Sequence, residues 1–378
     1  MSEEAFNKST FHFTKNLFKE CIKHFKSNDF YAYSPLSIQS CITMLYMGAE
    51  GETADSIAEA LHYNENFNKI EVASLIKILM ENGEEDESIE YANGLLVDSN
   101  LKISDFYQKL MKTYFHSNID KMDGKNNENT VKNVNQWIQG RTHGKIKDII
   151  SKMDLVNEEK KERKKFILLD AIYFKGRWAY EFNKTLTKPA KFWYEKDNFV
   201  TVDMMEVTNH FNYCRFNDQK LSVLELNYIE SELSLLIILP DDSQQLETLD
   251  ELADQLSMFD IVTMMYLKTV QVFLPKFSLE FTLDLKTALA NMGMSRLFEV
   301  GYDLKGVFDF KENPENVFID SVYHKTIISV DEEGAKAKDE KEELGDVEIV
   351  FRVDKPFLFC LKHKWEHNII ISGFVRKL

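Results

Sequence analysis

Proline and glycine are scarce in this sequence, with 6 prolines and 14 glycines among 378 residues. It has no stretch rich in glycine, serine or proline of the kind that joins flexible domains. Internal repeats and low-complexity tracts are also lacking. These absences exclude tethered modules and repeat architectures, and they predict one continuous domain over residues 1–378.

Long apolar runs are missing as well. The longest, Leu233–Leu239, is interrupted by Ser234 and stops at Pro240, whereas a membrane-spanning helix needs about 20 apolar residues. We therefore interpret it as a buried strand and expect no membrane partner. The first residues, Met1–Phe6, have neither the basic nor the apolar segment of a secretion leader. We expect a protein that stays in the cytoplasm, leaves the cell by another route or has lost its leader.

Positive charge is in deficit, because 46 Lys and Arg face 62 Asp and Glu, a net charge of −16. Such an acidic chain is a poor ligand for nucleic acid or anionic lipid, since both are negatively charged. Cysteine is rare too, and its 4 positions show no paired spacing. A chain of this length needs no disulfide framework, so we expect free thiols in or near the core. These are Cys21, Cys41, Cys214 and Cys360.

Apolar residues recur at helical spacing through much of the first third of the chain, beginning with the run from Phe11 to Phe25. At Ser34-Pro35 a capping serine precedes a proline at the first helical position, where the missing N–H costs nothing. Gly48 is predicted to end that helix. Another helix is predicted to start near Glu50–Thr53.

The pattern changes from residue 166 onward. Short apolar or alternating runs predict strands, with a helix predicted among them at Leu283–Met292. Strands interspersed irregularly with helices indicate an α+β fold. The predicted strands are Phe166–Phe174, Leu221–Leu226, Leu233–Leu239, Thr269–Leu274 and Ile369–Val375.

One segment is unusually charged. Residues 331–343 contain seven acids and three bases, and they lie between strand-like runs at Phe318–Val330 and Val347–Val353. On composition alone this is a solvated surface loop.

Two segments resemble catalytic or ligand-binding motifs, but neither meets the requirements of its motif. His363–His367 matches H-x-x-E-H, in which two histidines of one helix bind zinc. Here the five residues lie between two strand-like runs, so we favour a hairpin turn over a zinc site. Gly140–Ile146 has neither the spacing nor the Ser or Thr of a phosphate-binding loop. We expect no enzyme, no metal and no cofactor.

A series of short motifs runs through the chain in a fixed order. From about residue 11 to residue 375, these motifs resemble those of the serpin (serine protease inhibitor) family. The matching segments are Ser34–Ile38, Gly48–Thr53, Asn135–Ile138, Thr142–Ile146, Ala171–Trp178, Met204-Met205, Leu274–Phe277, His324-Lys325, Glu332–Gly334, Lys355–Phe357 and Gly373–Val375.

The resemblance implies an α+β fold of three β-sheets with eight or nine helices and an exposed reactive-centre loop at about residues 334–355. Inhibitory members offer a peptide bond of this loop to a serine protease, and the cut loop then inserts into the largest sheet. The implied partner is a serine protease, and we expect a monomer. The resemblance also makes the extracellular space an expected location of the protein, with the cytoplasm as the alternative.

The hinge that precedes the bait bond departs from the family pattern. Inhibitory members carry mostly small residues after the glycine, because alternate side chains of an inserted strand enter the sheet. Ala335 and Ala337 fit that pattern, but charges follow on both faces, and a buried unpaired charge costs several kcal/mol. Two hypotheses therefore stand: a suicide inhibitor, and a non-inhibitory serpin whose loop is a substrate or serves binding, carrier or chaperone-like roles. The hinge comprises Glu332, Glu333, Gly334, Ala335, Lys336, Ala337, Lys338 and Asp339.

Counting from Gly334 by the family pattern puts the scissile bond near Glu348-Ile349. The loop is a few residues short before Pro356, so we widen the scissile region. Glu348 or Asp346 at the primary position predicts a protease that prefers acidic residues, whereas Leu344 predicts a chymotrypsin-like one. The widened region is Leu344, Gly345, Asp346, Val347, Glu348 and Ile349.

Three further residues, Ser34, Ser37 and His324, match family positions that lie beneath the opening sheet. The Asn that the family places beside them is Asp170 here. We favour a satisfied buried hydrogen-bond cluster over a pH switch, and if Asp170 faces His324 the charged pair holds the sheet shut. The resemblance places Trp178 where the inserting loop first enters, although a plain core aromatic is the alternative.

Overall fold

The computed structural model describes most of the chain. The described residues are 3–25, 28–63, 67–84, 88–122, 127–151, 153–155, 164–241, 258–299, 303–309, 317–334, 345–364 and 368–378. They form two compact units, each assembled from three stretches of sequence. The first unit is Met1–Glu20, Ser34–Tyr173 and Phe281–Ile327; the second is Cys21–Tyr33, Phe174–Glu280 and Ile328–Leu378. The single domain stays a prediction.

Most of the long helices lie in the first third of the chain, as the apolar spacing predicts. The Ser34 side chain caps α2 by accepting the backbone N–H of Ser37, and Pro35 fills the first helical position, which confirms the predicted start. The α-helices in the described residues are α1 (Glu3–Phe25), α2 (Pro35–Gly48), α3 (Gly51–Ala60), α4 (Lys69–Glu84), α5 (Asp105–Tyr114), α6 (Asn127–Arg141), α8 (Met258–Thr263) and α9 (Lys286–Leu289).

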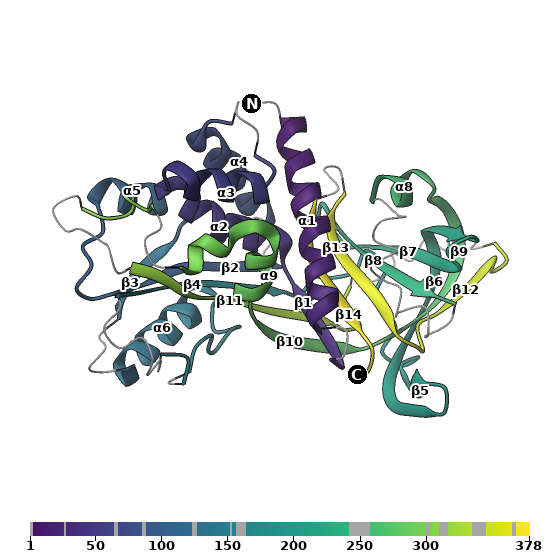
Figure 1. Cartoon of the computed structure of the whole chain (residues 1–378). Coiled ribbons are helices and arrows are strands. Elements are labelled where there is room, and N and C mark those ends of the chain that lie inside the picture. The colour runs from purple at the N-terminus through teal and green to yellow at the C-terminus, as the bar shows by residue number, and fades with distance from the viewer. Residues whose placement is uncertain are drawn as a thin grey trace. The chain divides into compact units, whose positions relative to one another are not determined.

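A five-stranded sheet has the strand order β10-β11-β4-β2-β3. Helix α6 packs on it through Val134 and Ile138, which share a buried cluster with Leu96 of β2 and Leu169 of β4. Figure 1 shows α6 on one side of these strands and α2 and α3 on the other. The strand bounds are β2 (Ile89–Asp98), β3 (Asn118–Met122), β4 (Lys164–Phe174), β10 (Phe277–Asp284) and β11 (Val317–Val330).

A nine-stranded sheet follows the order β1-β14-β13-β8-β7-β6-β9-β12, with β5 also paired to β6. Its last strand, β12, lies at the edge and pairs with β9 in parallel. The strand bounds are β1 (Phe30–Tyr33), β5 (Lys188–Glu195), β6 (Asn198–Phe216), β7 (Leu221–Asn227), β8 (Leu233–Pro240), β9 (Tyr266–Pro275), β12 (Ile349–Arg352), β13 (Phe357–His363) and β14 (Ile369–Val375).

The five strands predicted from apolar runs are all present, as β4, β7, β8, β9 and β14. A helical segment is present within the predicted range Leu283–Met292, but it starts later than predicted. Strand β10 continues to Asp284, helix α9 begins at Lys286, and a π-helical stretch follows at Ala290–Met294. Gly293 has φ +96° there, a left-handed conformation that breaks regular α-helical geometry.

The described strands join into two hydrogen-bonded sheets, where the resemblance implies three. The reason is the 19-residue strand β6, which pairs with β5, then with β9, and at its end with β7. One long strand thus connects two sets of strands by continuous hydrogen bonding.

Several smaller expectations also have an outcome. All four cysteines are buried free thiols. The H-x-x-E-H motif begins at the end of β13, where the His363 N–H donates to the Asn368 carbonyl at 3.0 Å and leads into β14; residues 365–367 lie outside the described part of the chain. No helix among the described residues is long and apolar enough to cross a membrane.

Candidate functional site

The described part of the loop begins in the second unit, where β11 gives way to residues 331–334. The backbone N–H of Trp178 donates to the Glu333 carbonyl at 2.9 Å, and the Phe182 N–H donates to the Glu332 carbonyl at 3.2 Å. Gly334 forms an isolated parallel β-bridge with Trp178. The hinge is therefore held as extended backbone up to Gly334, the last residue described before the gap at 335–344.

Gly334 occupies a site without room for a side chain. A Cβ built there would lie 2.7 Å from the Glu181 Cα and 2.8 Å from the Trp178 carbonyl oxygen. Both neighbours are backbone atoms, which cannot rotate away as a flexible side chain can. The hinge glycine is thus required by close approach of two backbones.

Trp178 is the main side chain beneath the hinge, and only 2% of it is exposed. Its ring stacks on Tyr228 at 4.5 Å between centroids with 13° between planes, and it meets Phe182 edge-on at 5.8 Å. The indole Nε1 donates to the Asp331 carbonyl at 2.7 Å. Trp178 therefore contacts the hinge through both backbone and side chain, as well as packing in the core.

Lys276 and Thr187 hold the carboxylate of Glu332, which is buried. Lys276 Nζ lies 2.9 Å from Oε2, and the Thr187 hydroxyl donates to Oε1 at 3.1 Å. Burial alone would raise the pKa of Glu332, but these partners stabilise the charged form more strongly, so its pKa lies below the usual value. The hinge acid is thus a paired anion.

Lys175 forms a second clamp on the same segment. Its Nζ lies 2.9 Å from Asp331 Oδ2 and 2.9 Å from Glu333 Oε2. The hydrogen bonds that Lys175 donates to Glu333 and Asp331 raise its pKa well above the usual value. Although burial acts to raise the pKa of Asp331, the backbone N–H of Glu333 and Lys175 lower it overall. Two lysines therefore pair with three consecutive acids of the hinge.

The distal end of the loop is fixed at Glu348. Its backbone N–H donates to the Thr269 carbonyl at 2.9 Å, and its carboxylate accepts from the Thr269 N–H at 3.2 Å and pairs with Lys268. The hydrogen bond from Lys268 lowers the pKa of Glu348. From Ile349 the chain continues as β12, in register with β9 from Val270.

Residues 345–347 lie just before this anchor, and all three are exposed and non-helical. Val347 has 45% of its surface exposed although it is apolar. The structure therefore presents three of the predicted scissile-region residues in solvent, Glu348 in ion-paired contact and Ile349 in a strand. Leu344 and the hinge residues Ala335, Lys336, Ala337, Lys338 and Asp339 lie outside the described residues.

A buried polar cluster occupies the first unit. The Nδ1 atom of His324 lies 2.6 Å from Asp170 Oδ2, and the Ser37 hydroxyl donates to the other oxygen of Asp170. The Ser34 backbone N–H donates to His324 Nε2 at 2.9 Å. Because Nε2 accepts this bond, the ring hydrogen sits on Nδ1 and donates to Asp170. The imidazole and the carboxyl group are thus joined by a buried hydrogen bond.

This arrangement places Asp170 opposite His324, which is the condition on which the sequence interpretation made the pair hold the sheet shut. It brings together all four residues predicted beneath the sheet: Ser34, Ser37, Asp170 and His324. Asp170 belongs to β4 and His324 to β11, which are neighbours in the five-stranded sheet. The cluster therefore links two adjacent strands to the start of α2, and Asn93 of β2 extends it by donating to the Ser40 hydroxyl at 3.2 Å.

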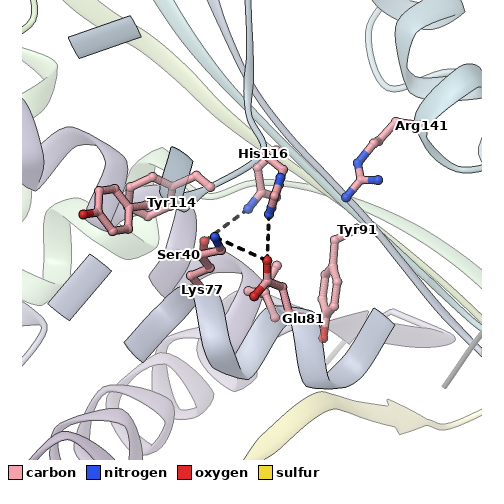
Figure 2. Close-up of a pocket in the computed structure, with 10 residues that line it drawn as sticks. Ser40, Lys77, Glu81, Tyr91, Tyr114, His116 and Arg141 are labelled. Atoms are coloured by element: carbon pink, nitrogen blue, oxygen red, sulfur yellow. Dashed lines mark hydrogen bonds and ion pairs between the residues drawn. The ribbon is translucent and has the colours of Figure 1, made fainter. Parts of the chain in front are cut away.

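A pocket also lies in the first unit, between α4 and the residue that follows α5 (Figure 2). Glu81 accepts from His116 at 3.0 Å and lies 3.6 Å from Lys77 Nζ. Arg141, Tyr91, Ser40, Asn93 and Tyr114 also contribute polar groups to the lining. The acid of this pocket is thus paired from two sides, and we assign the pocket no part in the function of the loop.

The comparisons with known proteins agree over nearly the whole chain. A family model described as serpin (serine protease inhibitor) matches residues 8–378. The chain belongs to the serpin family. This family is one of protease inhibitors and not of proteases. The leukocyte elastase inhibitor of Equus caballus is 30% identical, with 98% of each chain covered. Serpin B3 of Homo sapiens is 28% identical, with 96% of each covered.

Solved serpin structures share the fold. Serpin48 of the insect Tenebrio molitor has a TM-score of 0.86 at 25% identity, covering 100% of this chain and 99% of that one. Uncleaved ovalbumin has a TM-score of 0.87 at 23% identity, covering 99% and 100%. The serpin fold expected from the motifs is therefore confirmed.

Three functional contacts escaped the sequence interpretation, namely those of Lys175, Lys276 and Lys268. Lys175 and Lys276 lie inside motifs of the resemblance, but those motifs do not show which acid each lysine meets. The available signal was charge complementarity: three consecutive acids at 331–333 require cations when they leave solvent. Nothing near Lys268 in sequence indicates Glu348.

Proposed function

We propose that this serpin inhibits a serine protease by presenting the loop at about residues 334–355 as bait and inserting it after cleavage. The protease serine attacks a loop carbonyl and the acyl-enzyme forms, as with any substrate. The freed hinge side of the loop then enters the five-stranded sheet between β4 and β11. New strand hydrogen bonds and newly buried side chains supply the free energy.

The observation that carries this proposal is the parallel bridge between Gly334 and Trp178. Strand β11 runs directly into residues 331–334, which are already extended and hydrogen-bonded. For insertion the chain must turn back after Gly334 and run alongside β11, and the bridge already fixes this turning point next to the residues that follow β4. The adjacency of β4 and β11 in the sheet supports the same route.

The partner we propose is a serine protease of either acid-preferring or chymotrypsin-like specificity. Support comes from the family description and from relatives named leukocyte elastase inhibitor. The charged residues after Ala335 favour the competing outcome, in which the loop is cut as a substrate before it inserts. Insertion and hydrolysis are in kinetic competition, so the charges set how many inhibitor molecules one protease consumes.

The test is to incubate the full chain with a panel of serine proteases and analyse the products on denaturing gels. We expect a complex that survives denaturant, together with a large rise in the melting temperature of cleaved protein. Cleavage by every protease without a stable complex, and without a rise in the melting temperature of the cleaved protein, would show a non-inhibitory serpin. A Gly334→Val variant is the matched control, because its side chain clashes with the backbone at the bridge; it should be cut and should form little complex.

A further inference from the structure

The two described ends of the loop limit where a protease can cut. Gly334 is fixed on Trp178, and Glu348 is fixed on Thr269 and Lys268. Only residues 335–347 lie between these anchors. The family count from Gly334 places the scissile bond at Glu348-Ile349, directly on the distal anchor.

A serine protease makes two demands on the bond it cuts. The side chain before the bond must enter the specificity pocket, and the amide nitrogen after it must be free to leave with a proton. The Glu348 carboxylate is held by Lys268 and by the Thr269 N–H, and Ile349 is paired in β12. These contacts argue against Glu348-Ile349. The Glu348 N–H is bonded to the Thr269 carbonyl, which argues against Val347-Glu348.

Three bonds of the predicted region remain. Gly345-Asp346 has no side chain to fill a pocket. Asp346-Val347 meets both demands, and Leu344-Gly345 has a side chain before the bond but Leu344 lies outside the described residues. Asp346 and Val347 are exposed, with no secondary structure.

The number of residues that cleavage frees for insertion distinguishes the two remaining bonds. Strand β4 has 11 residues, or roughly 36 Å at about 3.3 Å per residue. A cut after Leu344 frees the ten residues 335–344 for insertion, fewer than β4 can pair. A cut after Asp346 frees the twelve residues 335–346, enough to pair along the whole strand edge.

We infer that the bait bond is Asp346-Val347 and that the target is a serine protease whose pocket takes an aspartate. This inference rests on the proposed function and narrows it. Lys268 and Glu348 act as a positioning pair: they set the distal end of the loop and withdraw Glu348 from proteolysis.

The experiment uses the full chain with granzyme B, which cleaves after aspartate, and with chymotrypsin and glutamyl endopeptidase. Intact-mass analysis reads the released C-terminal fragment. We expect granzyme B to yield a denaturant-stable complex and a fragment beginning at Val347. Asp346→Ala should slow complex formation at least ~100-fold, since a pocket built for a polar group rejects analogues that lack it. Leu344→Ala should leave the rate within about twofold.

The outcomes separate the two proposals. A stable complex whose fragment begins at Gly345 or Ile349 overturns this inference and leaves the inhibitor proposal standing. Failure of all three proteases to form a complex, with no rise in melting temperature after cleavage, overturns the proposed function itself.

The role of the Lys268–Glu348 pair is tested separately, by the rate of cleavage at Glu348-Ile349. Lys268→Met removes the charged partner of Glu348, so glutamyl endopeptidase should cut Glu348-Ile349 faster by an order of magnitude than in the unmodified chain. Lys188→Met is the matched control, because it removes the same charge from exposed β5 of the same sheet. Equal cutting of all three proteins would show that the pair does not protect the bond.

Discussion

The Nδ1 atom of His324 lies 2.6 Å from Asp170 Oδ2, and neither side chain has any exposed surface. The two residues belong to β11 and β4, the strands between which the loop is proposed to insert. The Ser34 backbone N–H donates to the other ring nitrogen of His324, and Asp170 is contacted at both oxygens, by His324 and by the Ser37 hydroxyl. Separating these strands must break this contact first.

We predict that Asp170→Asn raises the melting temperature of the uncut protein by roughly 2 °C, equivalent to about 1 kcal/mol. The amide oxygen still accepts from His324, while the Ser37 hydroxyl turns to the Asn93 oxygen 3.5 Å away, and a buried charge is removed. Asp170→Ala is the control and should lower stability by about 1–3 kcal/mol, since it leaves two donors unpaired. Thermal unfolding of both variants tests this prediction. A lower melting temperature for Asp170→Asn than for the parent would contradict the hydrogen bonding described around Asp170.

A second prediction compares two glycines of the loop. Gly334→Ala places a Cβ less than 3 Å from three backbone atoms, whereas nothing lies within 4 Å of a Cβ at Gly345. We expect Gly334→Ala to displace the hinge from Trp178 and cost about 1–3 kcal/mol, and Gly345→Ala to change nothing beyond error. Melting curves and indole fluorescence measure both effects. Equal stability of the two variants would mean that the bridge is not maintained in solution.

A third prediction concerns acid. The pKa of Glu332 is lowered in the folded state, so its ion pair stabilises the fold above the unfolded pKa of about 4.3 and loses that effect as pH falls through the folded value. Glu332→Gln should therefore unfold at lower temperature than the parent at pH 7, by about 1 kcal/mol because Lys276 is partly solvated. The difference should shrink as the pH falls through the lowered folded-state pKa and Glu332 becomes protonated. Asp197→Asn, an exposed control, should leave the melting temperature at pH 7 unchanged.

Sequence patterns predicted those parts of the fold whose causes are local. The Ser34-Pro35 cap and the apolar strand at Leu233–Leu239 depend on neighbours within a few residues, and both were confirmed. The helix at Leu283–Met292 was placed too early, because pairing of β10 extends the strand to Asp284. A periodicity argument cannot see a hydrogen-bonding partner that is distant in sequence.

In the site, too, sequence patterns predicted the features with local causes and missed the contacts between residues distant in sequence. Motif order located Gly334, Trp178 and His324, but not the cations that hold the loop. Lys268 meets Glu348 across 80 positions of sequence, and an isolated exposed lysine carries no signal of such a partner. The scissile bond could be counted from the hinge by pattern, yet the distal anchor that argues against that count exists only in three dimensions.

The final prediction addresses the charges that follow Ala335. If they slow insertion, their removal should shift the competition from hydrolysis towards the trapped complex. We expect Lys336→Ala combined with Lys338→Ala to lower the number of inhibitor molecules consumed per protease severalfold, because both lysines enter the same face of the inserted strand. Titration of residual protease activity against inhibitor measures this number.

A control with the same loss of charge outside the insertion path is Lys184→Ala combined with Lys188→Ala. It should leave the number unchanged, because both residues are exposed and lie outside the loop. If both double variants consume the same number of inhibitor molecules per protease as the parent, the hinge charges do not limit insertion. The charges would then give no reason to expect a loop that is cut only as a substrate. If only the hinge variant becomes a more efficient inhibitor, the charged sequence itself sets the partition between substrate and inhibitor.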